Sequence, residues 1–284
     1  MISTPDLLIF ILSHPFIQRA IVATILTAIV SSTAGTFMVL RGLSFTASAV
    51  AHAALGGAAL GIFLSSTGIA PWFHPILGVI GFSLVVAAVT GYAGETGVTS
   101  RMEVAVGVTF ALAMGVAVFF MYFIPAEYVP QIWGYLIGDI FLLTMSDLIL
   151  LSVASLALIV STTLLFREFT YLSFDMEGLT AHGLNARFYH YLMITLASLA
   201  VAVATKAVGA ILVYAIMVAP AAAANEWAKT VLEVMKWVFA IALLSQLIGL
   251  ASSFFWHTSP SAIAGIIAAL VYLGALTAKR SVAR

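Results

Sequence analysis

Long apolar runs separated by short polar breaks dominate the pattern of this chain. A membrane-crossing helix needs about twenty apolar residues. The candidate segments are roughly 17–40, 48–66, 75–93, 102–124, 130–143, 146–166, 188–205, 207–224, 232–255 and 259–278. Because 130–143 is short, contains Gly134 and Gly138 and ends near Asp139, we expect it to be a partial or re-entrant element. The pattern predicts an all-α, polytopic membrane protein with about nine spans, or eight if one segment fails to cross.

Composition supports this class. Of the 284 residues, 63% are hydrophobic and only 8% are charged, whereas soluble domains carry about 25% charged residues. The formal net charge is zero, which disfavours a nucleic-acid partner. The absence of cysteine excludes disulfides and thiolate metal sites.

The chain is expected to form one membrane domain, residues 1–284. No cleavable signal peptide is evident, because Asp6 and no basic residue precede the first span. Residues 1–16 are expected to form an interfacial N-terminal segment, although they could begin the first span.

The basic residues predict the orientation, since cytoplasmic loops are enriched in Lys and Arg. If the Arg41 turn is cytoplasmic, only Arg19 and Lys206 fall outside. The basic residues then inside are Arg41, Arg101, Arg167, Arg187, Lys229, Lys236, Lys279, Arg280 and Arg284. The N-terminus is therefore predicted outside and the C-terminus in the cytoplasm.

The longest polar interruption, predicted to be cytoplasmic, contains a short helical segment within residues 170–187. Asp175 is placed to cap a short helix, Glu177 would lie in its first turn, and Gly183 is suited to the position after its end. Such a helix either docks a soluble partner or is a solvated connector, and the residues leave both open. His182 and His190 flank this segment and are expected on the cytoplasmic surface.

His52 is the most unusual polar residue in the apolar segments. An unpartnered polar group in hydrocarbon is costly, so His52 is expected to face protein or a water-filled path. Ser48 lies one turn earlier on the same helix face. Neutral imidazole suits Zn²⁺, and also Mn²⁺ or Fe²⁺ in mixed nitrogen and oxygen sites.

Asp139, Asp147, His74 and His257 are further residues whose side chains can bind a metal ion. Asp139 is the best candidate for a compensating charge, because non-helical backbone there could line a cavity. Asp147 reads as a helix-start residue, and His74 and His257 as interface residues. No HExxH motif and no nucleophile–base set is present, so no catalytic residues and no enzymatic activity are expected.

Three motifs together resemble the permease subunits of the ABC importers for zinc, manganese or iron, over about residues 17–278. The first is Arg41-Gly-Leu-Ser-Phe45, followed by Ser48 and His52 where the family has Asp-x-x-x-His. The second is Phe174-Asp-Met-Glu177 followed by Gly183-Leu184. The third runs from Val208-Gly209 through Pro220 to Ala224.

The resemblance implies a function and its partners. The segment with Phe174, Asp175, Glu177, Gly183 and Leu184 would be the coupling helix that sits in a groove of the ATPase subunit. Because the chain has no G-x-x-x-x-G-K-[ST] motif, ATP would bind a separate polypeptide. The short external loops imply a separate extracellular metal-binding solute-binding protein. No resident cofactor is expected, and the metal ion is cargo.

The resemblance also implies a homodimer in a prokaryotic cell membrane, with the path near the dimer interface. The transient path site would comprise His52, Ser48 and Asp139. Small-residue stretches suited to close helix contact are Gly57-x-x-x-Gly61, Gly134-x-x-x-Gly138 and Ala221–Ala224.

Two alternatives remain open. One is an ABC permease for a metal chelate, such as a siderophore or cobalamin, which would need a wide path and no His52. The other is a secondary transporter or channel in which His52 and Asp139 relay protons, with flux that needs no ATPase.

Overall fold

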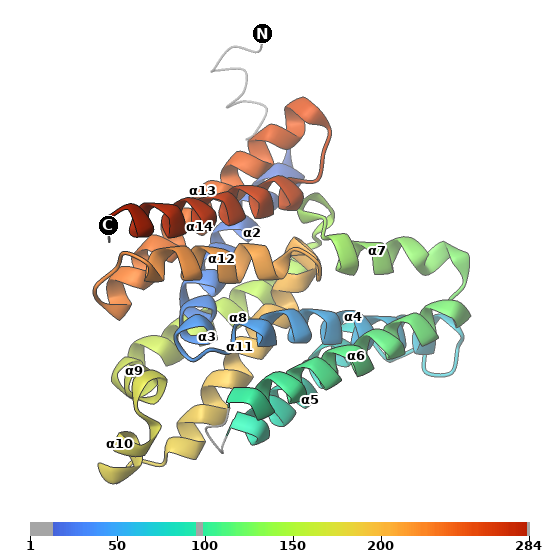
Figure 1. Ribbon diagram of the computed structural model, residues 1–284. Coiled ribbons are helices and arrows are strands. Elements are labelled where there is room, and N and C mark those ends of the chain that lie inside the picture. The colour runs from blue at the N-terminus through green and yellow to red at the C-terminus, as the bar shows by residue number, and fades with distance from the viewer. Residues whose placement is uncertain (1–13, 95–98, 283–284) are drawn as a thin grey trace.

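The computed structural model describes residues 14–94 and 99–282, and this part of the chain is almost entirely helical (Figure 1). Every backbone polar group must be satisfied within a segment in hydrocarbon, so long apolar runs form helices. The elements are α2 (Pro15–Val30), η1 (Ser31–Gly35), α3 (Thr36–Leu40), α4 (Ser44–Ser66), α5 (Pro75–Gly94), α6 (Thr99–Phe123), η2 (Ala126–Tyr128), α7 (Val129–Ile137), η3 (Ile140–Leu142), α8 (Met145–Leu164), α9 (Phe166–Phe174), α10 (Met176–Ala181), α11 (Ala186–Val208), α12 (Val213–Asn225), α13 (Val231–Trp256) and α14 (Pro260–Val282).

Eight helical runs within the described residues are long and apolar enough to span a membrane, which confirms the polytopic all-α prediction. The first of them, Pro15–Leu40, passes through the π-helical turn η1 without ending. Gly35 allows this turn to approach α12 closely, because a Cβ there would collide with the carbonyl oxygen of Met217. The expected interfacial segment 1–16 lies largely outside the described residues.

The prediction of a span at 207–224 is wrong. Helix α11 continues to Val208, the chain turns at Gly209 with φ of 94°, and α12 is only 13 residues long. Hydrophobicity alone could not place this break, because the residues around it are apolar. The partial element expected at 130–143 is confirmed as α7, Gly138 and η3.

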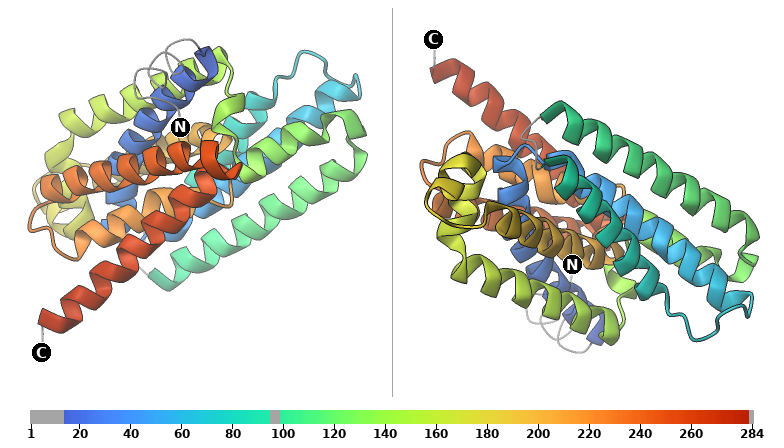
Figure 2. Two further views of the ribbon diagram at one scale, coloured as in Figure 1. Left: turned by 90° about the horizontal axis from the view of Figure 1, so that it is seen from above. Right: turned by 90° about the horizontal axis from the view of Figure 1, so that it is seen from below.

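Helix α4 and the run Pro15–Leu40 are the two most enclosed of the eight long helical runs. It contacts α5, α6, α7, α11 and α12, and in both views of Figure 2 it runs beside α5 and α6. Its Gly57 faces Gly78 of α5, where a Cβ on either residue would overlap the backbone of the other. Close helix contact of this kind depends on small residues.

Two of the small-residue stretches expected near the homodimer contact pack within the chain instead. Gly57 and Gly61 pack against Gly78 and Pro75 of α5 in the same chain. The alanines of α12 also pack internally, with Ala221 and Ala224 clustered on Val234 and Val238 of α13.

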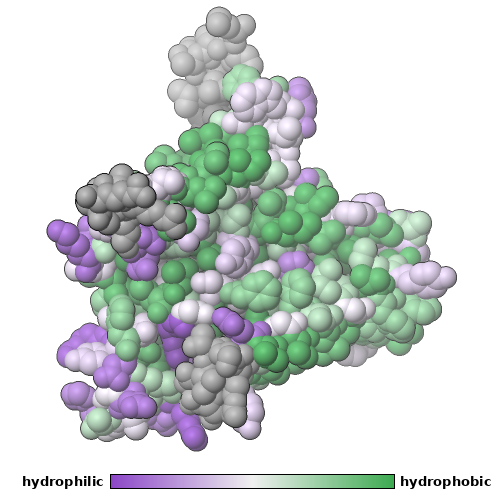
Figure 3. Space-filling view, viewed as in Figure 1, coloured by the Kyte–Doolittle hydropathy of each residue, from purple (hydrophilic) through white to green (hydrophobic). Residues whose placement is uncertain are grey.

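The visible surface is mostly apolar, as a lipid-facing protein requires (Figure 3). Hydrophilic residues gather at the end of the molecule where α9, α10 and the α12–α13 connection lie. This end carries the segment that the sequence predicts to be cytoplasmic.

Candidate functional site

His52 lies in the interior of α4 and is half-buried. Its Nδ1 is 2.8 Å from the carbonyl oxygen of Ser48. A carbonyl only accepts hydrogen bonds, so Nδ1 carries the proton and Nε2 keeps its lone pair. The ring packs on Phe110 of α6 at a centroid distance of 4.6 Å. His52 can therefore offer one oriented nitrogen ligand, with its other nitrogen held by the backbone.

Ser48 orients His52 through its main chain and contributes no charge. Ser48 is only 9% exposed, and it occupies the turn of α4 directly before His52. Within the described residues, no group of three or more His, Asp or Glu side chains is placed to hold a metal ion. At this level of α4 the chain presents the imidazole of His52, with the hydroxyl of Ser48 one turn before it.

Asp139 lies where the sequence predicted non-helical backbone, but its carboxylate has a local role. It caps η3, with Oδ1 accepting a hydrogen bond of 3.0 Å from the amide of Phe141. The residue is half-buried, and no hydrogen bond joins it to His52.

Asp139 directly follows Gly138, where the turn after α7 meets the turn at Gly209 after α11. The sequence did not predict this contact. The amides of Ala210 and Ile211 donate to the carbonyl oxygens of Tyr135 and Leu136, at 2.9 Å and 3.2 Å. Gly138 has φ of 78°, and a Cβ on it would overlap the backbone at Val208 and Gly209. The backbone groups freed by breaking the helices thus pair with each other inside the protein, as hydrocarbon requires.

The coupling segment folds as the sequence predicts. Asp175 caps α10 by accepting a hydrogen bond of 2.7 Å from Gly178, and Gly183 follows the helix with φ of 79°. Phe174, Glu177 and Leu184 are exposed around it. A surface groove beside α10 is lined by Arg167, Glu168, Tyr171, Leu179, His182 and Leu184. Exposed apolar and charged groups around a groove suit a protein partner.

Of the remaining histidines, His182, His74 and His257 are exposed, as expected. The prediction for His190 is wrong. It is fully buried, because Arg41 and the end of α5 surround its imidazole. The sequence signal that could have indicated this is the pair Gly91 and Gly94, which leaves room beside α5.

The sequence matches the profile of the ABC 3 transport family over residues 13–279. A membrane protein of Synechocystis described as uncharacterized, slr2045, is 29% identical and covers 95% of this chain and 92% of its own. The manganese transport system membrane protein MntC of Listeria innocua is 25% identical and covers 92% of this chain and 90% of its own. PsaBC from Streptococcus pneumoniae, solved in complex with Fab, has a similar fold with a TM-score of 0.81, 24% identity, and coverage of 96% of this chain and 95% of that one. Because the family profile spans nearly the whole sequence, this chain belongs to the ABC 3 transport family.

Proposed function

We propose that this chain is the membrane permease subunit of an ATP-driven importer that carries a divalent metal ion, Zn²⁺, Mn²⁺ or Fe²⁺, into the cytoplasm by alternating access. The observation that carries the proposal is the oriented Nε2 of His52 on the enclosed helix α4, in a chain of the ABC 3 transport family. The name of the Listeria relative, a manganese transport system membrane protein, supports a metal cargo.

The path runs along α4 in this proposal. Two copies of the chain form a homodimer, and His52 of each copy contributes to a transient site near the interface, with Ser48 beside it and Asp139 supplying nearby negative charge. A transport site must bind its ion weakly enough to release it, so few ligands are sufficient. Imidazole suits Zn²⁺ and, together with an oxygen ligand, also Mn²⁺ or Fe²⁺.

ATP acts on a separate partner subunit, and an extracellular solute-binding protein delivers the ion. Helix α10, with Phe174, Asp175, Glu177, Gly183 and Leu184, docks to the ATPase. The N-terminus lies outside and the C-terminus in the cytoplasm, which places α9 and α10 on the ATPase side. Charge at the exposed Glu177 and the groove beside α10 support this assignment.

The test is flux into proteoliposomes that contain the chain with or without its ATPase partner. The proposal predicts uptake of free Zn²⁺, Mn²⁺ or Fe²⁺ only when both the ATPase and ATP are present. Uptake by the chain alone would contradict it and favour a secondary transporter. ATP-dependent uptake of chelated iron, with no uptake of free ions, would favour a chelate permease.

A further inference from the structure

Arg41, which is half-buried, and His190, which is fully buried, form a contact between two distant segments. Nη1 of Arg41 is 2.6 Å from Nδ1 of His190. Arg41 follows the last residue of α3, and His190 lies in the second turn of α11. A guanidinium has only donors, so Nδ1 must accept and carries no proton. Burial lowers the pKa of Arg41 to about 10, so its guanidinium stays charged at neutral pH.

The second nitrogen of His190 extends the contact to a third helix. Nε2 is 2.9 Å from the carbonyl oxygen of Gly91 in α5, and it must donate because a carbonyl only accepts. His190 is therefore neutral with its proton on Nε2, which is the tautomer opposite to that of His52. The hydrogen bonds run in one direction, from Arg41 through His190 to α5.

Helix α5 has the shape needed to accept this imidazole. A Cβ on Gly94 would lie 3.0 Å from Cε1 and Nε2 of His190. A Cβ on Gly91 would overlap the ring of Tyr191, the next residue of α11. Both glycines thus let the start of α11 lie directly against the end of α5.

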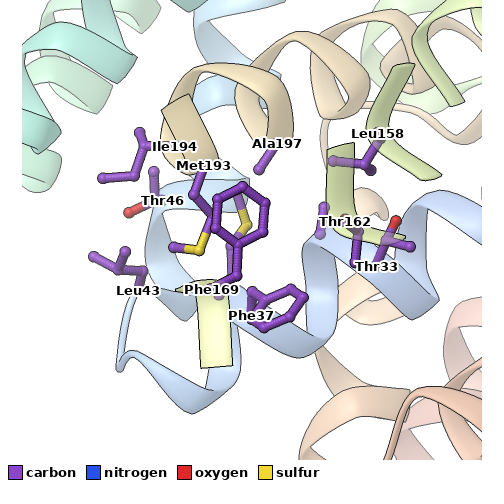
Figure 4. A pocket seen from close by; sticks show the side chains of 12 residues that line it. Thr33, Phe37, Leu43, Thr46, Leu158, Thr162, Phe169, Met193, Ile194 and Ala197 are labelled. Carbon is purple, nitrogen blue, oxygen red and sulfur yellow. The ribbon is translucent and has the colours of Figure 1, made fainter. Parts of the chain in front are cut away.

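An apolar cluster connects the region around Arg41 and His190 to α10. Leu179 of α10 is buried with Phe169, Leu172, Ala186 and Met193 and with Phe37 of α3. The rings of Phe37 and Phe169 meet edge to face at 5.8 Å (Figure 4). The amide of Arg41 donates to the carbonyl oxygen of Phe37 at 3.1 Å. Helix α10 thus packs through one cluster against α9, α11 and the end of α3.

Helix α4 starts from this junction. Gly42 turns the chain with φ of 69°, and α4 begins at Ser44. Leu43 and Thr46 line the same small cavity as Met193 (Figure 4). His52 lies farther along α4, about 12 Å from its first residue, Ser44, at 1.5 Å per residue.

We propose that Arg41 and His190 are positioning residues that transmit movement of the coupling segment to α4, and thereby to His52. The inference rests on the proposed function in one respect, that the ATPase acts on α10. The hydrogen bond between Arg41 and His190 fixes the start of α4 to α11, so that α4 follows α11 when α10 is displaced. Without an acceptor at position 190, the half-buried Arg41 loses its partner and α4 is released from this movement.

The chain has no cysteine, so spin labels can be placed at chosen exposed positions. A pair at Thr180→Cys and Leu156→Cys reports movement of α10, and a pair at Phe45→Cys and Leu156→Cys reports movement of the start of α4. Distances are measured in the full complex with its ATPase, with and without a non-hydrolysable ATP analogue. The proposal predicts that the nucleotide changes both distances in the otherwise unaltered chain.

Two substitutions at the same position separate transmission from packing. His190→Leu removes the acceptor, and His190→Gln retains both an acceptor for Arg41 and a donor for Gly91. In His190→Leu the nucleotide still changes the distance between the labels at 180 and 156, but not the distance between the labels at 45 and 156. Metal uptake per ATP falls about tenfold, within the usual range of coupling between sites. His190→Gln restores the α4 change and most of the uptake.

An unchanged α4 response in His190→Leu would overturn the relay. If His190→Leu does not fold, Arg41→Met tests the same link by removing the donor, with the same expected loss of the α4 response. If neither distance responds in the unaltered chain, the docking role of α10 fails as well. If only the α10 distance responds there, the relay alone is overturned.

Discussion

Nζ of Lys206 lies 2.8 Å and 2.7 Å from the two carboxylate oxygens of Asp147. This ion pair joins the end of α11 to the start of α8, where Thr144 and Asp147 also form a capping box. Nζ of Lys206 is also 5.9 Å from the ring centroid of Tyr135 in α7. The pair therefore holds three elements next to the contact between Gly138 and Gly209.

Replacement of Lys206 by Met should destabilise the protein. The side chains are 34% and 17% exposed, so the effect should lie between those of surface and buried pairs, at about 1–2 kcal/mol. Thermal unfolding in detergent measures it. A double-mutant cycle with Asp147→Asn isolates the pair, and additive effects of the two changes would show that the ion pair contributes nothing.

Gly138→Ala should destabilise the protein strongly, because a methyl group there meets the main chain of Val208 and Gly209 at a positive φ. We expect a loss of about 3 kcal/mol or more, at the upper end of overpacking effects. Gly134→Ala is the matched control, since a Cβ at Gly134 has no neighbour within 4 Å. Equal thermal stability of the two variants would contradict the close packing of Gly138 against Val208 and Gly209.

Glu177→Lys should uncouple ATP hydrolysis from transport while the protein still folds. The charge of an exposed residue on α10 would be reversed where the ATPase is proposed to dock. We expect metal uptake per ATP to fall about tenfold. Glu103→Lys, on the exposed surface of α6, is the control and should keep the ratio. Unchanged coupling in Glu177→Lys would remove the docking role from α10.

Ser48→Asp should shift cargo preference toward Mn²⁺. A carboxylate one turn before His52 adds a hard oxygen ligand and a negative charge beside the imidazole. Competition between Zn²⁺ and Mn²⁺ in ATP-dependent uptake measures the preference, which should change by about tenfold or more. Ser48→Asn is the control, because it adds a similar volume without charge. An unaltered preference in Ser48→Asp would place the residue away from the ion.

The sequence predicted features whose cause is local. The cap at Asp175 and the turn at Gly183 follow from propensities of single residues, and both are present. The long helices follow from apolar runs that must satisfy their own backbone. These parts of the fold and the coupling segment required no knowledge of tertiary contacts.

Features that depend on distant contacts were not predictable. The break at Gly209 lies in a continuous apolar run and exists because Gly138 meets it from another element. His190 looked like a surface residue because its partners, Arg41 and Gly91, are 149 and 99 residues away in sequence. The proton position on His52 also needed the structure, since the hydrogen bond to Ser48 determines it.

The most direct test of the central claim is ATP-dependent metal uptake by His52→Ala in proteoliposomes with the ATPase partner. The variant removes the imidazole of His52 from α4 and leaves α10 and the groove beside it unaltered. The account predicts that uptake is abolished while the complex assembles and hydrolyses ATP. Uptake at the unaltered rate in His52→Ala would contradict a metal path through this residue.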